Sequence, residues 1–322
     1  MSELDSKILR ILLKDGRISY DELARKCGSS KNKIWKRCRA MEKKGIIKGA
    51  TTHINFQDFG FAALATLLIR VEAQQIEEVM EFIEKITEIR AYRQYNSVYN
   101  IRAFATLRDL NELDYIKQVI RRKLPIIGLK TYIWTGVRNI PENLNLWVAL
   151  SDSNESGKSN SNAGKPRDKI IIDDVDNQIL QKLTFDGRMA FTEIGKEIGL
   201  STNTILKRYR KLVENGSIKV SIQIDPKKIG YTSIMDFNIA FTTHIGLSDD
   251  IVESFAKIPD IIIITKTSGD YDLQLTAMIR DTEESFLIQD QIARVQGVTQ
   301  IEASSRKIPD KWPTPQQYIS TI

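Results

Sequence analysis

The densest chemistry in the sequence is a short basic segment, residues 29–45, with the sequence SSKNKIWKRCRAMEKKG. Residues 30–44 carry seven lysines and arginines against the single anion Glu42, a formal charge of +6. Ser30 is a typical helix N-cap and Gly45 is typical of the position after a helix end, so we predict a helix between them. At about 100° per residue, its apolar positions share one side and most cations share the other. A surface this basic favours a polyanionic partner, since its own charges repel one another.

A second set of polar side chains occupies residues 269–273, with the sequence GDYDL. Gly269 permits a tight turn or the close approach of a ligand, and the carboxylates of Asp270 and Asp272 could receive an amino group. The same residues could instead form a tight turn capped by aspartate side chains, as in many β-hairpins. The sequence leaves both explanations open, and we treat these three residues as a tentative effector-binding site.

The sequence gives little indication of metal binding, catalysis or membrane insertion. The only cysteines are Cys27 and Cys38 and the only histidines are His53 and His244, so no group has the number or spacing of a zinc site. We therefore predict no metal site, no cofactor and no catalytic residues. No apolar run approaches the roughly 18 residues of a membrane span, and the first residues lack the apolar core of a signal peptide. These absences predict a cytoplasmic protein with no membrane partner.

The composition sets the scale of the fold. Hydrophobic residues make up 42% and charged residues 27% of the 322 residues, which is typical of a globular protein with two to four domains. The net charge of +6 and the pI of about 9.1 lean towards a polyanion, and the concentration of charge in residues 30–44 says more than the sum.

The basic helix stands third in a series of short helices. Residues 4–14 have apolar positions at helical spacing, and residues 19–27 begin with Ser19 followed three residues later by Glu22, the spacing of a capping box. Residues 46–55 are rich in β-forming residues and are expected to form a hairpin or wing that closes at Gly60. The order predicts a winged helix-turn-helix. Residues 63–137 then alternate as strand, helix, strand, strand, helix, strand, the ferredoxin-like order.

The whole series recurs about 171 residues later. The segment Asp5–Leu9 returns as Asp176–Leu180, and the Asp-Gly-Arg triplet at residues 15–17 returns at residues 186–188. A second βαββαβ series runs from about residue 234 to residue 305, so the chain is a tandem duplication. We predict an α+β protein in which two winged helix-turn-helix domains alternate with two ferredoxin-like domains. The expected boundaries are residues 1–60, 61–150, 170–231 and 232–308, with a Ser/Asn/Gly-rich flexible linker at 151–169 and a C-terminal tail at 309–322.

Together these residues resemble the Lrp/AsnC family of transcription regulators. The resemblance covers nearly all of both halves. Its carriers are Leu4-Asp5, Ile8-Leu9, Asp15-Gly16-Arg17, the Ile34-x-x-Arg37 helix ending in Lys44-Gly45-Ile46-Ile47, and Gly269-Asp270-Tyr271-Asp272-Leu273. It implies a helix-turn-helix joined to a ferredoxin-like RAM domain, which dimerises through its sheet and often binds an amino acid. We therefore expect a sequence-specific regulator that binds double-stranded DNA and responds to an amino acid or another small effector. The duplication leaves open whether the RAM sheets pair within one chain or form a homo-oligomer.

The expected DNA contacts lie on the basic helix of each copy. The helix start, Asn32 and Lys36 would reach base edges, whereas Arg37, Lys43 and Lys44 would hold phosphates. The full predicted sets are Ser30, Lys31, Asn32, Lys33, Lys36, Arg37, Arg39 and Lys43 in the first copy, and Thr202, Asn203, Thr204, Lys207, Arg208 and Arg210 in the second. Residues 201–215 have a formal charge of only +3. The first helix should bind DNA more strongly.

Two other functions stay open at this stage. Sirohaem decarboxylases are similar in architecture, and Tyr92-Arg93-Gln94-Tyr95 with Tyr99-Asn100 is faintly similar to their strand motif, although no histidine lies there. An architectural chromatin protein would bind DNA by charge alone. The first-copy turn at residues 97–101 lacks the glycine and both carboxylates of residues 269–273, and Ser97 is expected to be strained there.

Overall fold

A computed structural model describes residues 1–146, 172–242 and 247–314. The described chain divides into two compact units: residues 1–58, 145–146, 172–225 and 311–314 form one, and residues 59–144, 226–242 and 247–310 form the other. We call the first the helical unit and the second the sheet unit. The predicted linker at 151–169 lies outside the described residues, as does the tail from residue 315 onwards. The expected domain boundaries stay predictions.

The helical unit contains three helices from each repeat. They are α1 (Glu3–Lys14), α2 (Tyr20–Cys27) and α3 (Lys31–Lys43), followed by α6 (Asp174–Phe185), α7 (Phe191–Ile198) and α8 (Thr202–Glu214). Local sequence explains where α3 and α8 begin, because the Ser30 and Ser201 hydroxyls accept the backbone N–H groups of Lys33 and Thr204. Gly28 ends α2 in the left-handed conformation that glycine adopts most easily.

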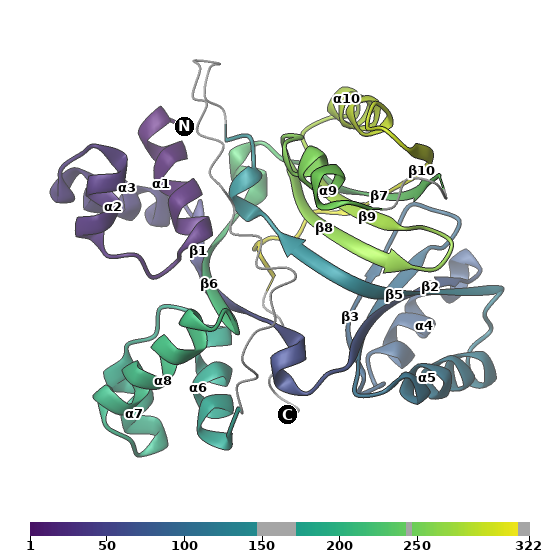
Figure 1. The fold of residues 1–322 in the computed structure, drawn as a ribbon, viewed down its shortest axis with the longest axis horizontal. Coiled ribbons are helices and arrows are strands. Elements are labelled where there is room, and N and C mark those ends of the chain that lie inside the picture. The colour runs from purple at the N-terminus through teal and green to yellow at the C-terminus, as the bar shows by residue number, and fades with distance from the viewer. Residues whose placement is uncertain (147–171, 243–246, 315–322) are drawn as a thin grey trace. The chain divides into compact units, whose positions relative to one another are not determined.

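The segment expected to form a hairpin or wing is a single strand. Strand β1 (Ile47–Ile54) pairs antiparallel with β6 (Ile218–Ile224) from the second repeat, with Thr51 opposite Ser221. The hairpin expectation is wrong because the other copy supplies the partner strand, so no turn is needed within the segment. Helix α1 packs on β6 and α6 packs on β1, so each repeat covers the other's strand. Figure 1 shows the two helical groups meeting at this sheet.

The sheet unit contains the two ferredoxin-like series, as the sequence predicted. The first consists of β2 (Ala63–Arg70), α4 (Ile76–Ile83), β3 (Ile89–Gln94), β4 (Ile101–Leu107), α5 (Leu110–Lys123) and β5 (Gly128–Asn139). The second consists of β7 (Ser233–Phe241), α9 (Asp249–Ala256), β8 (Ile261–Ser268), β9 (Leu273–Ile279), α10 (Thr282–Ala293) and β10 (Val298–Lys307). Short 3-10 helices lie at Phe56–Phe59, Ala73–Gln75, Pro141–Asn143 and Pro226–Ile229.

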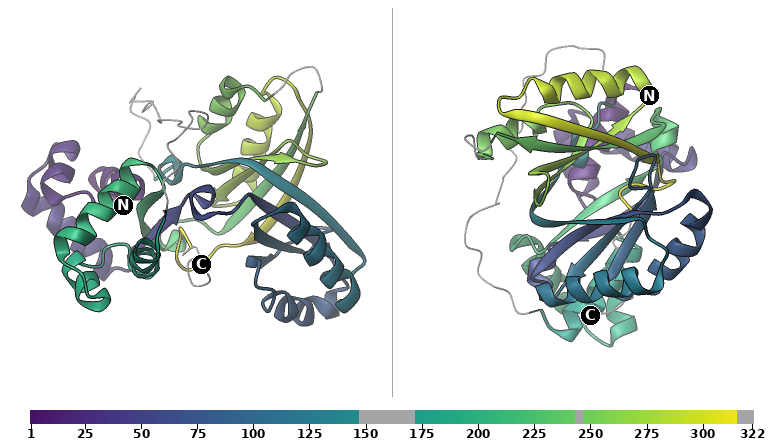
Figure 2. Two further views of the ribbon diagram at one scale, coloured as in Figure 1. Left: turned by 60° about the horizontal axis from the view of Figure 1, so that its bottom comes forward. Right: turned by 90° about the vertical axis from the view of Figure 1, so that its right-hand side faces the viewer.

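All eight strands of the sheet unit form one sheet in the order β10-β7-β9-β8-β5-β2-β4-β3. The two repeats join where β5 pairs with β8, from Ile133 opposite Ser268 to Asn139 opposite Ile263. The outer edges also meet, since the Asn96 N–H donates to the carbonyl of Ser305 at 2.8 Å. Helices α4 and α5 cover the outer face of the first half of the sheet, and α9 and α10 cover the outer face of the second half (Figure 2). The two ferredoxin-like halves therefore pair within the chain.

An apolar core lies between each half of the sheet and its helices. Leu67, Ile101 and Ile116 are fully buried in the first half, and Phe237 and Leu275 in the second. Each such side chain contributes roughly 1.5–3 kcal/mol by leaving water. The alternate strand residues face the other way, and there the sheet carries polar groups: Arg102, Asp236 and Thr276 are all buried.

The expected strain at Ser97 is not found. Asp260 is the one non-glycine residue with a positive φ in the described ranges, so Ser97 avoids the left-handed region. The Asn100 side chain makes two hydrogen bonds to the backbone of Val71, one to its N–H and one to its C=O. This turn is held by an amide, whereas Asp272 holds the corresponding turn of the second repeat. The expectation was wrong because it assumed that both turns share one backbone path.

Candidate nucleic-acid interface

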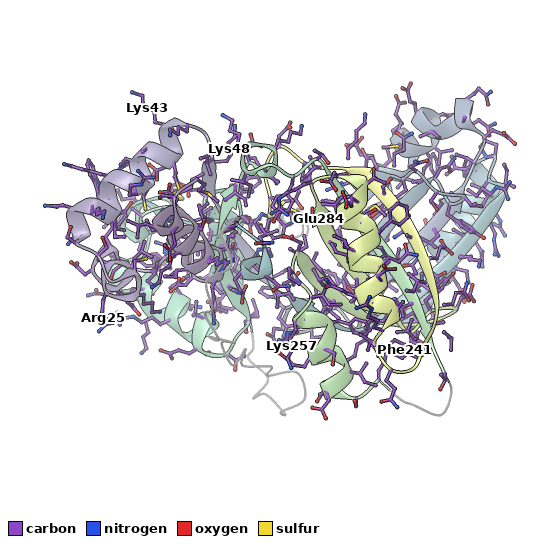
Figure 3. The ribbon with its side chains drawn as sticks, turned by 90° about the horizontal axis from the view of Figure 1, so that it is seen from above. Arg25, Lys43, Lys48, Phe241, Lys257 and Glu284 are labelled. Carbon is purple, nitrogen blue, oxygen red and sulfur yellow. The ribbon has the colours of Figure 1, made fainter. Side chains whose placement is uncertain are left out.

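Helix α3 exposes a polar and cationic face. Ile34, Cys38 and Met41 are buried against the rest of the first repeat. Lys43 extends away from the end of the helix (Figure 3). Exposed predicted contacts on or before α3 are Ser30, Lys31, Asn32, Lys33, Lys36, Arg39 and Lys43. Seven of the eight predicted first-copy residues thus share one exposed surface, which suits contact with a DNA groove and its phosphates.

The eighth residue, Arg37, serves the fold. Its Nε donates to Asp5 Oδ1 at 2.7 Å, and Nη2 donates to Asp5 and to the Ser2 hydroxyl. Burial alone would raise the pKa of Asp5, but the hydrogen bonds from Arg37 and Ser2 outweigh it and hold this pKa below its usual value. Arg37 therefore fastens α3 to the start of α1. Its predicted phosphate contact stays a prediction.

Arg208 repeats this arrangement in the second copy. Its Nη1 donates to both carboxylate oxygens of Asp173, at 2.8 and 2.7 Å, and to Asp176 Oδ1 at 2.9 Å. Sequence reasoning placed Arg37 and Arg208 on the DNA side. The signal for the structural role was present, because both copies keep an aspartate at the start of the first helix and an arginine at this point of the third.

Two cations of α3 already have acidic neighbours. Lys31 lies 2.8 Å from Asp21, and Arg39 lies 2.9 Å from Glu42. Exposed pairs of this kind contribute about 0–1 kcal/mol, so a phosphate can replace the carboxylate at little cost. Pairs of this strength would compete only weakly with a phosphate for the two cations.

Helix α8 offers a weaker version of the same face. Thr202, Asn203, Lys207 and Arg210 are exposed, whereas Thr204 is half-buried with its hydroxyl 2.8 Å from that of Ser201. The predicted residues of the second copy are thus brought together except for Arg208, which binds the two aspartates. The lower positive charge gives this helix a smaller attraction for phosphates.

Sequence reasoning missed Trp35. Its side chain is 46% exposed on α3, with the Arg39 guanidinium 5.8 Å from its ring centroid. The available signal was its position beside Lys36, about 100° from the buried Ile34, where a purely structural aromatic residue is not needed. An exposed indole on a recognition helix can contact a thymine methyl group or stack on a base. Leu206 holds the equivalent position in α8.

The Asp-Gly-Arg triplets join the two repeats of the helical unit. The Gly16 N–H donates to the Val220 carbonyl at 2.8 Å, and the Gly187 N–H donates to the Ala50 carbonyl at 2.9 Å. Arg17 donates from Nη1 to the Gly187 carbonyl at 2.7 Å, while Arg188 donates from Nε to the Gly16 carbonyl at 2.6 Å. We call these reciprocal contacts the seam. The seam fixes α3 and α8 in one pair within a single chain.

Both glycines of the seam are required by close approach. A Cβ atom on Gly16 would lie 2.8 Å from the carbonyl carbon of Ser221, and one on Gly187 would lie 2.9 Å from the Thr51 nitrogen. Backbone atoms cannot give way as the end of a side chain can. The Asp-Gly-Arg repetition that revealed the duplication is therefore a contact between the copies.

The tentative effector site lies in the sheet unit, at the turn between β8 and β9. Gly269 has φ 155°, and a Cβ atom there would lie 2.5 Å from the Tyr132 ring. Asp270 forms an ion pair with Lys130 at 2.7 Å, and Asp272 accepts the Phe241 N–H at 2.8 Å. Both carboxylates have partners within the fold, which matches the tight-turn explanation. The effector role stays a prediction.

None of the helices in the described ranges combines the length and apolar character that crossing a membrane requires.

Two family descriptions match the helical unit. Residues 1–48 match winged helix-turn-helix DNA-binding domains, and residues 172–213 match the AsnC-type helix-turn-helix domain. The HTH-type transcriptional regulator FL11 of Pyrococcus horikoshii is 34% identical over 131 residues, which cover 40% of this chain and 85% of that protein. The regulator LrpA of the same organism is 31% identical over 133 residues, covering 41% and 93%. Each relative is thus about as long as one repeat.

A solved structure is similar over the whole length. The siroheme decarboxylase NirDL aligns with 98% of this chain and 96% of its own, with a TM-score of 0.63 and 14% sequence identity. At that identity the likeness concerns the fold alone. It agrees with the two alternating pairs of helix-turn-helix and ferredoxin-like series described above.

Proposed function

This chain belongs to the Lrp/AsnC family of DNA-binding transcription regulators, and from that premise we propose that its two helix-turn-helix repeats read DNA as one intrachain pair with unequal heads. The observation that carries the proposal is the seam, together with the antiparallel pairing of β1 and β6. Two recognition helices held in this way approach one duplex together, as the two subunits of a dimeric regulator do.

The two heads differ on the surfaces that would meet DNA. Helix α3 has Trp35 where α8 has Leu206, and Lys43 where α8 has Glu214. A homodimer has identical heads and reads two equivalent half-sites related by a twofold axis. A single chain with unequal heads needs no such symmetry. We expect an operator with two different half-sites, bound in one orientation.

Selection of bound duplexes from a random pool tests this proposal. The enriched sequence should lack twofold symmetry, and its affinity should fall steeply with salt because several lysines and arginines displace phosphate counterions. Inverting one half-site should weaken binding about as much as scrambling it. A palindromic operator would contradict unequal heads. Equal binding of selected and scrambled duplexes at every salt concentration would instead favour an architectural chromatin protein.

A small effector, such as an amino acid, is part of the proposal. Its support is the family membership and the turn at residues 269–272, where Gly269 closely approaches Tyr132. Hydrogen exchange with and without each of the twenty amino acids would locate the site. Protection of residues 269–273 beyond that of residues 97–101 is the expected result, and equal protection would contradict a site in the second repeat.

Self-association is proposed to use surfaces other than the strand edges. The β5–β8 pairing and the Asn96–Ser305 hydrogen bond already occupy the edges at which the two halves meet. Light scattering over a range of concentrations would measure the oligomeric state. A dimer that persists after Asn96→Pro, which removes the N–H donor, would be consistent with contacts elsewhere.

We infer that the chain is not an enzyme. Its relatives at 30% identity or more are transcription regulators. The region of the faint decarboxylase motif is also occupied by the chain's own groups, because the buried Tyr95 hydroxyl donates to Asp236 Oδ2 at 2.6 Å. The visible absorbance of the purified protein with added siroheme gives a direct test. A shifted absorbance band accompanied by release of CO₂ would overturn this inference.

A further inference from the structure

The seam is chemically symmetric only in its backbone contacts. On one side, the Arg17 guanidinium lies 4.1 Å from the Phe191 ring centroid and 5.3 Å from that of Tyr209. Its two Nη atoms donate to the carbonyls of Gly187 and Met189. The planar cation is therefore covered by aromatic rings and has both ends hydrogen-bonded.

On the other side, Arg188 has one aromatic neighbour in place of two. The positions equivalent to Phe191 and Tyr209 hold Tyr20 and Cys38. Arg188 uses only Nε, towards Gly16, and across the described part of the chain neither its Nη atoms nor the Tyr20 hydroxyl has a hydrogen-bond partner. Replacing a tyrosine by a cysteine removes a ring. The donors that a ring would have covered are left facing open space.

That space is a cavity of about 400 Å³, within the size range of small-molecule sites. Arg17, Arg39 and Arg188 supply three positive charges around it and Glu42 one negative charge, while Ile18 contributes an apolar surface. Glu42 is paired with Arg39 at 2.9 Å, so the remaining positive charge is concentrated near Arg188. An adjoining depression of about 270 Å³ shares Glu42 and Arg188 and adds Lys48 and Asp186, whose charges offset each other.

The other groups near the cavity are neutral at physiological pH. Burial raises the pKa of the Cys38 thiol to about 11, and burial also raises the pKa of the Tyr20 hydroxyl. The cavity thus combines a planar guanidinium with two unused Nη donors, a neutral hydroxyl donor and net positive charge. A guanidinium with two parallel N–H groups matches the two oxygens of a phosphate or carboxylate group.

We propose that the cavity bounded by Arg188, Tyr20 and Arg39 binds a small molecule through its phosphate or carboxylate group. The Nη atoms of Arg188 would hold two oxygens, Tyr20 and Arg39 would approach the same group, and an apolar body would lie against Ile18. At the equivalent place in the second repeat, Tyr209 packs on Phe191 and lies 5.3 Å from the Arg17 guanidinium. The proposal concerns binding by the free protein and does not depend on the unequal DNA-reading heads.

Calorimetric titration of the full chain with inorganic phosphate, and separately with phenyl phosphate, tests the proposal, with chloride used to match ionic strength. We expect one saturable site per chain and several-fold tighter binding of phenyl phosphate, because its ring can lie against Ile18. Cys38→Tyr should abolish binding by filling the cavity as Tyr209 does. Arg39→Gln should weaken binding about fivefold.

Arg210→Gln is the matched control, since Arg210 is the second-repeat equivalent of Arg39 and does not line the cavity. It should leave phosphate binding unchanged. Thermal unfolding and circular dichroism identify variants that fail to fold. If Cys38→Tyr fails to fold, Arg39→Gln still tests the proposal, because Arg39 is exposed. Absence of saturable binding to the wild-type chain, or equal losses in Arg39→Gln and Arg210→Gln, would overturn the proposal.

A DNA phosphate is the other source of the same chemistry. Suppose that Arg188→Gln leaves phosphate binding by the free chain unchanged, yet lowers the affinity for duplex DNA and the salt dependence of that binding. The site then binds the DNA backbone. That result would overturn the assignment to a small molecule. Loss of phosphate binding in Arg188→Gln at unchanged duplex affinity is the result expected here.

Discussion

The two helix-turn-helix repeats share the same backbone contacts where they touch each other and differ where they face outwards. Both keep the Asp-Gly-Arg triplet, and both keep an arginine that ties the third helix to the first. The exposed faces of α3 and α8 differ in charge, and one has an exposed tryptophan. Contacts between the copies constrain both sequences at once, whereas each outer face can change without disturbing the other repeat.

The comparison also explains where new chemistry can arise. A position beside the seam, Cys38 in one copy and Tyr209 in the other, has changed in size while the backbone contacts around it have stayed. Duplication within one chain permits this asymmetry, because a homodimer must carry the same residue on both sides of its axis.

The largest effect is expected at the seam glycines. Gly16→Ala and Gly187→Ala should each lower the free energy of unfolding by about 3 kcal/mol, since the added Cβ would lie under 3 Å from the backbone of the other repeat. Chemical denaturation measures the change. Gly28→Ala is the control: it is left-handed, with nothing within 4 Å of the added Cβ, and should cost about 1 kcal/mol. Unequal losses at the two seam positions would show that the seam is less symmetric than its hydrogen bonds indicate.

Removal of Arg37 should have the next largest effect. Arg37→Ala leaves the buried Asp5 carboxylate without its cation and should cost about 2 kcal/mol at pH 7, less than for a fully buried pair because Arg37 is 40% exposed. The lowered pKa of Asp5 means that the pair stabilises the fold above the usual carboxyl pKa and loses this contribution as the pH falls below it. The difference from wild type should therefore shrink towards pH 3.

The exposed Lys33 provides the control for that measurement, because Lys33→Ala should change stability by less than about 0.5 kcal/mol. Arg208→Ala extends the comparison to the second repeat, where two aspartates share one arginine. A loss at Arg37 no greater than that at Lys33 would argue against its role in positioning α3.

Substitutions in the two recognition helices should have smaller effects, measured as unequal losses of DNA affinity. Lys36→Ala should weaken binding to the selected operator about tenfold, or roughly 1.4 kcal/mol, while Lys207→Ala should weaken it about threefold. Fluorescence anisotropy with labelled duplex at fixed salt measures both. Equal losses would remove the case for unequal heads, although the seam would still hold the repeats in one pair.

The smallest effect concerns His53 on β1, which faces Lys219 across the strand pair and has Gln223 as its second-repeat equivalent. Burial, assisted by the charge of Lys219, lowers the pKa of His53 to about 4. The His53 imidazole therefore binds a proton in the unfolded chain at a pH at which it stays neutral in the folded chain. The free energy of unfolding falls as the pH drops below about 6.5. Between pH 7.5 and pH 6 the loss should be about 0.8 kcal/mol. His53→Ile should flatten this dependence; an unchanged slope would mean that other groups cause it.

Local signals in the sequence were enough to predict the order of helices and strands. Ser30 and Ser201 cap their helices as expected, and the βαββαβ series follows the alternation of apolar residues. The expected wing was wrong because the partner of β1 lies about 170 residues away, and no local pattern encodes a strand pairing between copies. The exposed residues of α3 were predicted correctly as one surface, since helical periodicity alone determines which residues share a face.

The remaining parts of the site depend on packing. The ion pair of Arg37 with Asp5 could have been inferred from its recurrence as Arg208 with Asp176. The cavity beside Arg188 could not, because its lining comes from segments of both repeats that are far apart in the sequence. Sequence alone gives the residue types on each side but not the distance between them.

The seam also has a consequence for dosage. A regulator assembled from separate subunits dissociates as it is diluted. Its occupancy of an operator therefore depends on the total protein concentration and on the fraction of that protein that is paired. Here both repeats belong to one chain, so the pair stays together when the protein is diluted. Occupancy should then rise with the first power of protein concentration, and this dependence should persist at very low protein concentrations.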